Sequence, residues 1–333
     1  MKKVNKTTTI GLDTVEVTVN KHITLDTTEI KSQKHNKSIG RITPVKDGVK
    51  ISICLPKALR EDNIQPLGVV DACQLLRVIT EVTEALECFQ IDISQAQVRR
   101  VEINSTAELE NPTHVPAIMK FLSLMLLQND IKVFVTAHGE NDVLYKNIPL
   151  DSAIFRTRPV IESIRTERLT NKRFAFKFYN KGLESNIEGK GILRLEQVHN
   201  KESLNYAGIS DELQDFLSLE NIVKLIDLFK KDFQKSFLDV LWYDPATNVT
   251  FPYKLVNTIQ VLLKDRRPQT VAEIQRDLIS IDFELFERAC YAHYGEKKKI
   301  AQQAIRRVEK SERIPTQRGA ITELVKIFRA IVY

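Results

Sequence analysis

The stretch Arg173-Phe-Ala-Phe-Lys-Phe-Tyr-Asn-Lys-Gly-Leu-Glu184 predicts a β-strand, because apolar and polar side chains alternate along it. Successive side chains of a strand point to opposite faces of the sheet. Lys177, Tyr179 and Lys181 share one face, so Tyr179 is expected to lie on a cationic surface. Three aromatic residues share the other face and are expected to bury together: Phe174, Phe176 and Phe178.

Two further strands are predicted from the same alternation. The segment Gly191-Ile-Leu-Arg-Leu-Glu196 places Glu196 on its polar side, and Val98-Arg-Arg-Val-Glu-Ile-Asn104 does the same for Glu102. Three strands therefore offer one phenol and two carboxylates. A tyrosine near two carboxylates suggests metal-assisted attack on a phosphodiester, since carboxylates bind divalent cations that stabilise charge on phosphate.

These motifs resemble the rolling-circle replication initiators of the filamentous-phage gene II and related plasmid type, the phage/plasmid replication protein II/X family. The resemblance covers residues 40–205, and Gly48-Val-Lys-Ile-Ser-Ile-Cys-Leu-Pro-Lys-Ala-Leu59 looks like the strand-to-helix entry of that family. Glu102 stands where the family usually has Asp, so its carboxylate reaches one methylene further. The matching motifs follow the family's order: Arg100-Val-Glu102, Tyr179-Asn-Lys181-Gly-Leu-Glu184 and Leu193-Arg-Leu-Glu196.

The resemblance implies a site-specific DNA nicking-joining endonuclease. Tyr179 would cut one strand of a DNA origin, form a 5′-phosphotyrosine link, free a 3′-hydroxyl and later rejoin the strand. Lys177 and Lys181 would favour the phenolate electrostatically. Mg²⁺ or Mn²⁺ is the expected cofactor, because carboxylates are hard oxygen ligands. The expected metal ligands are Glu102, Glu196 and Glu184.

Several alternatives remain open at this point. Glu184 is a metal ligand, a proton acceptor or a partner of Lys181. A mobilisation relaxase uses the same chemistry for DNA transfer, and a non-catalytic DNA-binding regulator would keep the fold without cutting. Each acid could also be an ordinary strand residue paired with a neighbouring lysine or arginine on a solvated sheet face.

The charge of the chain fits a polyanionic partner. Its 333 residues carry a formal net charge of +6, although acidic residues are interspersed with the basic ones. The expected partner is a double-stranded DNA origin, together with a host helicase, because no P-loop motif is present, and a host DNA polymerase. The oligomeric state is left open, with a homodimer as one option. The predicted DNA-binding residues are Arg100, Arg194, Lys297, Lys298, Lys299, Arg306 and Arg307.

The pattern of apolar residues predicts an α+β fold with an antiparallel or mixed sheet and helices on one face. Strands are expected at residues 14–19, 49–53 and 131–136, with helices at 69–88 and 115–127. A mainly helical carboxy-terminal domain follows, in which residues 270–279 and 283–294 are compatible with a helix-turn-helix. The predicted domains are an N-terminal strand and polar loop at 1–39, a nicking domain at 40–205 and a helical domain at 206–333.

The amino terminus has lysines but no apolar run behind them, so it does not resemble a secretory signal. No window reaches the 18 or more apolar residues of a membrane span. The four cysteines have no CxxC spacing, which argues against a zinc site or a disulfide framework. The expected location is therefore the cytoplasm, without a membrane association, and the resemblance implies that the cell is a bacterial host.

Overall fold

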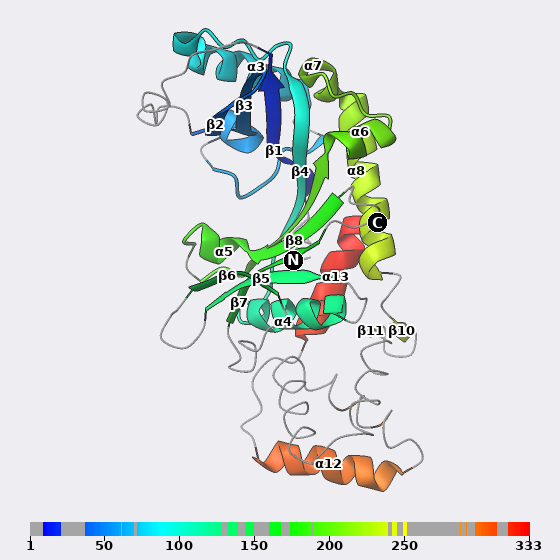
Figure 1. The fold of residues 1–333 in the computed structure, drawn as a ribbon. Coiled ribbons are helices and arrows are strands. Elements are labelled where there is room, and N and C mark those ends of the chain that lie inside the picture. The colour runs from blue at the N-terminus through cyan, green and yellow to red at the C-terminus, as the bar shows by residue number, and fades with distance from the viewer. Residues whose placement is uncertain are drawn as a thin grey trace, which may run out of the picture. The chain divides into compact units, whose positions relative to one another are not determined.

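The computed structural model describes residues 9–20, 37–60, 62–69, 72–127, 132–138, 144–149, 160–167, 174–187, 189–238, 242–244, 249–251, 287, 291, 297–311 and 319–333. Its main element is a nine-stranded sheet in which hydrogen-bonded neighbours follow the order β2-β3-β1-β4-β9-β8-β7-β5-β6 (Figure 1). The resolved registers, such as β1 with β3 and β5 with β7, are antiparallel. Strands far apart in the chain are thus neighbours, which is how motifs from distant segments come to lie on one sheet.

The strands have the following bounds: β1 Thr9–Val19, β2 Ile39–Val45, β3 Gly48–Cys54, β4 Gln97–Glu108, β5 Val133–His138, β6 Leu144–Pro149, β7 Val160–Thr166, β8 Phe174–Asn180 and β9 Ile192–Asn200. The helices are α2 Leu55–Leu59, α3 Ala72–Ala85, α4 His114–Leu127, α5 Lys181–Glu184, α6 Lys201–Tyr206, α7 Leu213–Phe216, α8 Leu219–Phe233, α12 Lys298–Ser311 and α13 Ala320–Val332. A short 3-10 helix, Glu87–Phe89, follows α3, and a π-helical turn, Gln234–Leu238, follows α8.

The chain forms two compact units, each built from three segments. Unit 1 comprises Met1–Ala107, Arg168–Lys177 and Arg194–Asp232, and unit 2 comprises the segments between and after them. The sheet strands β8 and β9 contribute residues to both units. The domain limits at residues 39 and 205 stay a prediction. The two units do not follow these limits, because each unit combines segments that are far apart in the sequence.

The core of unit 1 follows the alternation that the sequence predicts. Val17, Ile51 and Val101 lie on neighbouring strands and are completely buried. In α3, Leu75 and Val82 are buried on one stripe of the helix. Burying each such side chain stabilises the folded state by about 1.5–3 kcal/mol. The strands therefore turn this apolar face toward the core. The opposite face carries the polar residues.

Unit 2 contains an aromatic cluster that joins β8 to α13. The rings of Phe178 and Phe237 lie 5.1 Å apart, and those of Phe233 and Phe328 lie 4.8 Å apart, both edge to face. Figure 1 shows α13 beside α4, and a hydrogen bond of 2.7 Å between His114 Nδ1 and Glu323 Oε2 links the two helices. The C-terminal helix is therefore part of the packed core of this unit.

The predicted fold class is confirmed: a large antiparallel sheet with helices is followed by a helical segment near the C-terminus. The helices expected at 69–88 and 115–127 correspond to α3 and α4, and the strand expected at 14–19 begins earlier, at Thr9. A short hairpin, β10 Trp242–Asp244 with β11 Val249–Phe251, interrupts the helical region. The proposed helix-turn-helix lies outside the described residues, apart from two isolated positions in it.

Candidate functional site: a cluster of three carboxylates

A β-bulge in β1 places Asp13 beside β4. Leu12 pairs with Ile103 and Val15 pairs with Val101, so two residues of β1 face the single residue Glu102. Such an insertion bends the strand and re-aims a side chain, and bulges are common next to active sites. The bulge thereby turns a carboxylate toward Glu102 within unit 1.

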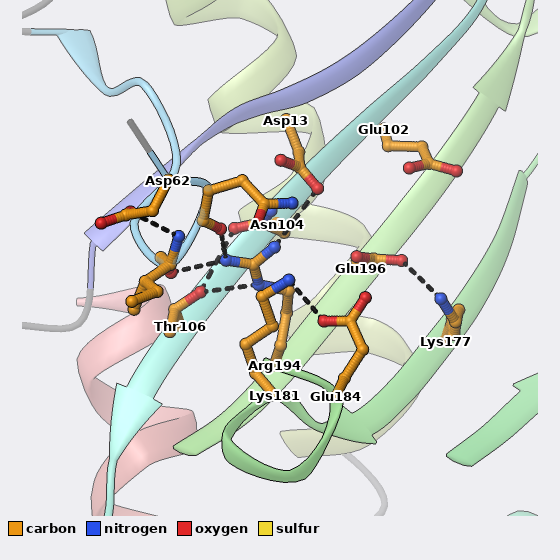
Figure 2. A network of polar contacts seen from close by, with 12 residues as sticks. Asp13, Asp62, Glu102, Asn104, Thr106, Lys177, Lys181, Glu184, Arg194 and Glu196 are labelled. Atoms are coloured by element: carbon orange, nitrogen blue, oxygen red, sulfur yellow. Dashed lines mark hydrogen bonds and ion pairs between the residues drawn. The ribbon is translucent and has the colours of Figure 1, made fainter. Parts of the chain in front are cut away.

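Asp13, Glu102 and Glu196 form a cluster on three neighbouring strands, β1, β4 and β9. One ligand oxygen from each carboxylate lies within 4.8 Å of the others. Figure 2 shows these side chains converging on one space above the sheet. Three carboxylate oxygens form a donor set that suits Mg²⁺ or Mn²⁺, which prefer hard oxygen ligands and retain water or phosphate oxygens at the remaining positions.

Burial and the neighbouring acids both act on the pKa of Glu102. Burial, followed by the negative charge of Glu196, raises the pKa of Glu102 to about 7, and Asp13 adds to the rise, whereas Arg100 and Lys177 oppose it. Without a cation, three carboxylates this close repel one another. A divalent cation between them would relieve that repulsion.

Basic side chains border the cluster. The ammonium group of Lys177 lies 3.4 Å from a carboxylate oxygen of Glu196. Arg100 donates to Glu16 at 2.7 Å and also to Glu102. Despite partial burial, Arg100 and Lys50 hold the pKa of Glu16 below its usual value. Arg100, predicted to contact DNA, is thus engaged by two carboxylates while remaining half-exposed.

Arg194 does not lie where a DNA-binding residue is expected. Its side chain is 0% exposed, and its guanidinium donates to Thr106 Oγ1 at 3.0 Å and to Asp13 Oδ2 at 3.3 Å. It also donates to the carbonyl oxygens of Asn63 and Ile64. The prediction that Arg194 contacts phosphate is therefore wrong for this structure. The N–H groups that would bind phosphate donate instead to Asp13 and to the backbone carbonyls of Asn63 and Ile64.

The strand alternation predicts Tyr179 on an open cationic surface. The structure shows instead that this residue is covered. The residue is 5% exposed, and the ammonium group of Lys181 lies 6.0 Å from its ring centroid. Lys181 departs from the strand pattern because β8 ends at Asn180, whose side-chain oxygen accepts from Leu183 N at 3.1 Å and caps α5. Both faces of β8 are largely covered, so alternation alone does not identify a solvent-facing side.

Glu184 is half-exposed and forms an ion pair with Lys181 one turn along α5. This contact is the one expected if Glu184 is a partner of Lys181, while its role as a metal ligand or proton acceptor stays a prediction. Among the described residues, the third carboxylate of the acidic cluster belongs to Asp13 and not to Glu184. Lys181 itself is buried.

Asp13 is the site residue that the sequence reasoning missed, although a signal was present. Leu12, Val15 and Val17 are all completely buried, so the apolar positions of β1 are three apart and then two apart. A strand keeps a period of two, and one extra residue indicates a bulge. An acid at such a break is a candidate for a site.

The predicted basic cluster lies in and just before α12. Lys297, Lys298, Lys299 and Arg306 are exposed, and Arg307 lies in the same helix. An exposed basic helix is compatible with phosphate contacts and also with a solvated surface. Its role in DNA binding stays a prediction.

No known protein family matches this sequence, and no characterised protein matches it either. A solved structure described as the rolling circle replication initiator protein from Geobacillus stearothermophilus is similar, with a TM-score of 0.31 and 10% sequence identity. The similarity covers 68% of this chain and 84% of that chain. Within the described ranges, no helix is both long and apolar enough to cross a membrane.

Proposed function

We propose that this protein is a rolling-circle replication initiator that nicks one strand of a DNA origin and later rejoins it. The observation that carries the proposal is the cluster of Asp13, Glu102 and Glu196, which has the donor chemistry of a divalent-cation site. Two of its members belong to the motifs that resemble those initiators. The positive net charge of the chain fits a DNA substrate.

In this proposal the three carboxylates hold Mg²⁺ or Mn²⁺, which supplies stabilisation of the charge that develops on the scissile phosphate. Lys177, paired with Glu196, keeps the carboxylate in place and adds positive charge at the edge of the site. Arg100 does the same for Glu102. These two basic side chains would orient the carboxylates, and the bound cation would contact the phosphate of the DNA.

Tyr179 is the proposed nucleophile. Its hydroxyl would lose a proton to solvent and its oxygen would form a bond to phosphorus while the bond from phosphorus to the 3′ oxygen breaks, and that oxygen would take a proton from solvent to give the free 3′-hydroxyl. The ammonium group of Lys181 lies 6.0 Å from the centroid of the Tyr179 ring and would add positive charge beside it. Because Tyr179 is nearly buried, the proposal requires that this side chain becomes more accessible when DNA binds.

The test uses supercoiled plasmid carrying the DNA that flanks this protein's own gene, with Mn²⁺. We expect nicked circles and a covalent DNA-peptide adduct that mass spectrometry maps to Tyr179. Tyr179→Phe should abolish both, whereas Tyr206→Phe, at a residue that is 72% exposed, should leave both intact. An adduct on Tyr206, or equal nicking by both variants, would overturn the assignment. A mobilisation relaxase gives the same products, and only its effect on DNA transfer in cells separates it.

A second candidate function is a non-catalytic DNA-binding regulator. The burial of Tyr179 favours it, because a covered phenol cannot attack DNA. In that case the wild-type protein and Tyr179→Phe would both shift the flanking DNA in a gel, and neither would cut it at any Mn²⁺ concentration.

A further inference from the structure

A short chain segment, residues 62–68, passes beside Asp13 and is attached at both of its ends; we call it the strap. At its start, Asp62 Oδ1 accepts from Ile64 N at 2.9 Å, which makes a tight turn. The carbonyl oxygens of this turn accept hydrogen bonds from Arg194. At its other end, Leu67 pairs with Leu12 through two backbone hydrogen bonds of 2.9 Å.

The second attachment depends on a glycine. A Cβ atom added to Gly11 would lie 2.1 Å from the carbonyl oxygen of Leu67, far inside a permitted contact. The strap can therefore approach β1 this closely only because position 11 has no side chain. The attachment is made through Leu12, the residue directly before Asp13.

Arg194 joins the strap to the carboxylate cluster. One guanidinium group binds the strap carbonyls, Thr106 on β4 and Asp13 on β1, and the side chain is completely buried. A buried arginine is costly unless its donors are satisfied, and its planar fork fixes the direction of each bond. Asp13 is thus held from two sides: its backbone by the bulge and the strap, and its carboxylate by Arg194.

We propose that Arg194 and the strap are positioning elements that hold Asp13 as the third ligand of a divalent cation. Both would then affect the affinity for the cation without contacting it. The inference rests on the proposed function only in taking the carboxylate cluster as a metal site. Arg194 acts through Asp13, because its hydrogen bond fixes the geometry of one carboxylate oxygen before the cation arrives.

The test measures Mn²⁺ binding by titration calorimetry and by the electron paramagnetic resonance of bound Mn²⁺, without DNA. Arg194→Lys keeps the positive charge but removes the planar guanidinium with its several N–H donors. Gly11→Ala adds a Cβ that forces the strap away from β1. We expect each to weaken Mn²⁺ binding roughly 10- to 100-fold, the usual effect of losing a residue that orients a ligand. Gly40→Ala is the matched control, because its added Cβ would be 3.7 Å from the nearest atom.

A double-mutant cycle separates positioning from a general effect on folding. In the Asp13→Asn background, Arg194→Lys should weaken Mn²⁺ binding no further, since the ligand through which it acts is gone. If Arg194→Lys does not fold, Thr106→Val replaces it in the cycle, because that variant removes one acceptor of the guanidinium and keeps every charge.

The possible results are distinct. If Asp13→Asn weakens Mn²⁺ binding while the folded Arg194, Thr106 and Gly11 variants bind like wild type, the inference is overturned and the metal site stands. The inference is also overturned if Glu102→Gln weakens binding and Asp13→Asn does not. If the wild-type protein binds no Mn²⁺, the metal site of the proposed function fails, and the inference fails with it.

Discussion

At the residue scale, the proposed chemistry depends on three carboxylates whose ligand oxygens lie within 4.8 Å of one another. Strand neighbours bring Glu102 and Glu196 together, and a bulge adds Asp13. Each acid has a basic partner: Glu102 pairs with Arg100, Glu196 with Lys177 and Asp13 with Arg194. These ion pairs offset part of the repulsion between the acids but leave Glu102 with a raised pKa.

The raised pKa of Glu102 predicts that stability falls with increasing pH in the absence of metal. The folded protein holds this proton up to about pH 7, whereas the unfolded chain releases it near 4.5. The stabilising contribution is complete below pH 4.5 and is lost as pH rises through 7. Between pH 4.5 and 6.5 the buried His199 contributes the opposite slope, so the loss is measured as the difference in pH dependence between wild type and Glu102→Gln in denaturant unfolding with EDTA. The exposed Glu84→Gln is the control, and an unchanged slope in Glu102→Gln would contradict the prediction.

His199 predicts the opposite dependence. Burial lowers the pKa of His199 to about 3, from 6.5 in the unfolded chain, so the folded state favours the neutral ring. Its contribution to stability is present above pH 6.5 and is lost as pH falls toward 3. Thermal unfolding of His199→Gln should lack the rise in stability with increasing pH that this ring contributes in wild type. His138→Gln, at a half-exposed histidine paired with Glu162, serves as the comparison and should retain the wild-type dependence.

At the element scale, caps, bulges and close approaches decide where side chains point. The cap at Asn180 ends β8 and turns Lys181 into α5, and the bulge in β1 turns Asp13 toward β4. The helix α13 is fixed in a different way, through the aromatic cluster and through the hydrogen bond between Glu323 and His114. Its attachment can be tested separately from the site.

Removal of one ring from the aromatic cluster should loosen α13. Phe328 is buried and contacts Phe233 with ring centroids 4.8 Å apart. Phe328→Ala should lower the free energy of unfolding by about 3–5 kcal/mol, as is usual for large-to-small changes in a core. Guanidinium unfolding measures the loss. Tyr333→Ala, at a residue 88% exposed, should change stability little, and a comparable loss there would show that the cluster is not what holds this helix.

At the scale of the whole molecule, the proposed function requires basic residues on surfaces that DNA can reach. Of the predicted DNA-binding residues, Arg194 is buried and Arg100 is paired, so the exposed residues of α12 are the stronger candidates. Affinity supplied by phosphate contacts depends steeply on salt concentration. That dependence distinguishes a DNA-binding helix from a solvated one.

The triple variant Lys298→Gln, Lys299→Gln and Arg306→Gln should bind DNA more weakly and with less salt dependence. Each phosphate contact contributes about 0.9 to the slope of log affinity against log salt, so the slope should fall by up to about 2.7. Fluorescence anisotropy over a salt series measures it. Lys224→Gln with Lys231→Gln in α8 is the control for lost positive charge. An unchanged slope in the triple variant would assign α12 to a solvated surface.

The sequence by itself determined the α+β class, the strands at Phe174–Asn180, Ile192–Asn200 and Gln97–Glu108, and the acids Glu102 and Glu196 on their polar positions. These follow from side-chain alternation, a local property that each segment expresses without its neighbours. Only the tertiary structure decided that Asp13 joins these acids, that Arg194 is buried against Asp13, and that Tyr179 is covered. The physical reason is that strand order, a bulge and a strap crossing β1 depend on pairing between distant segments, and burial depends on what packs against a face.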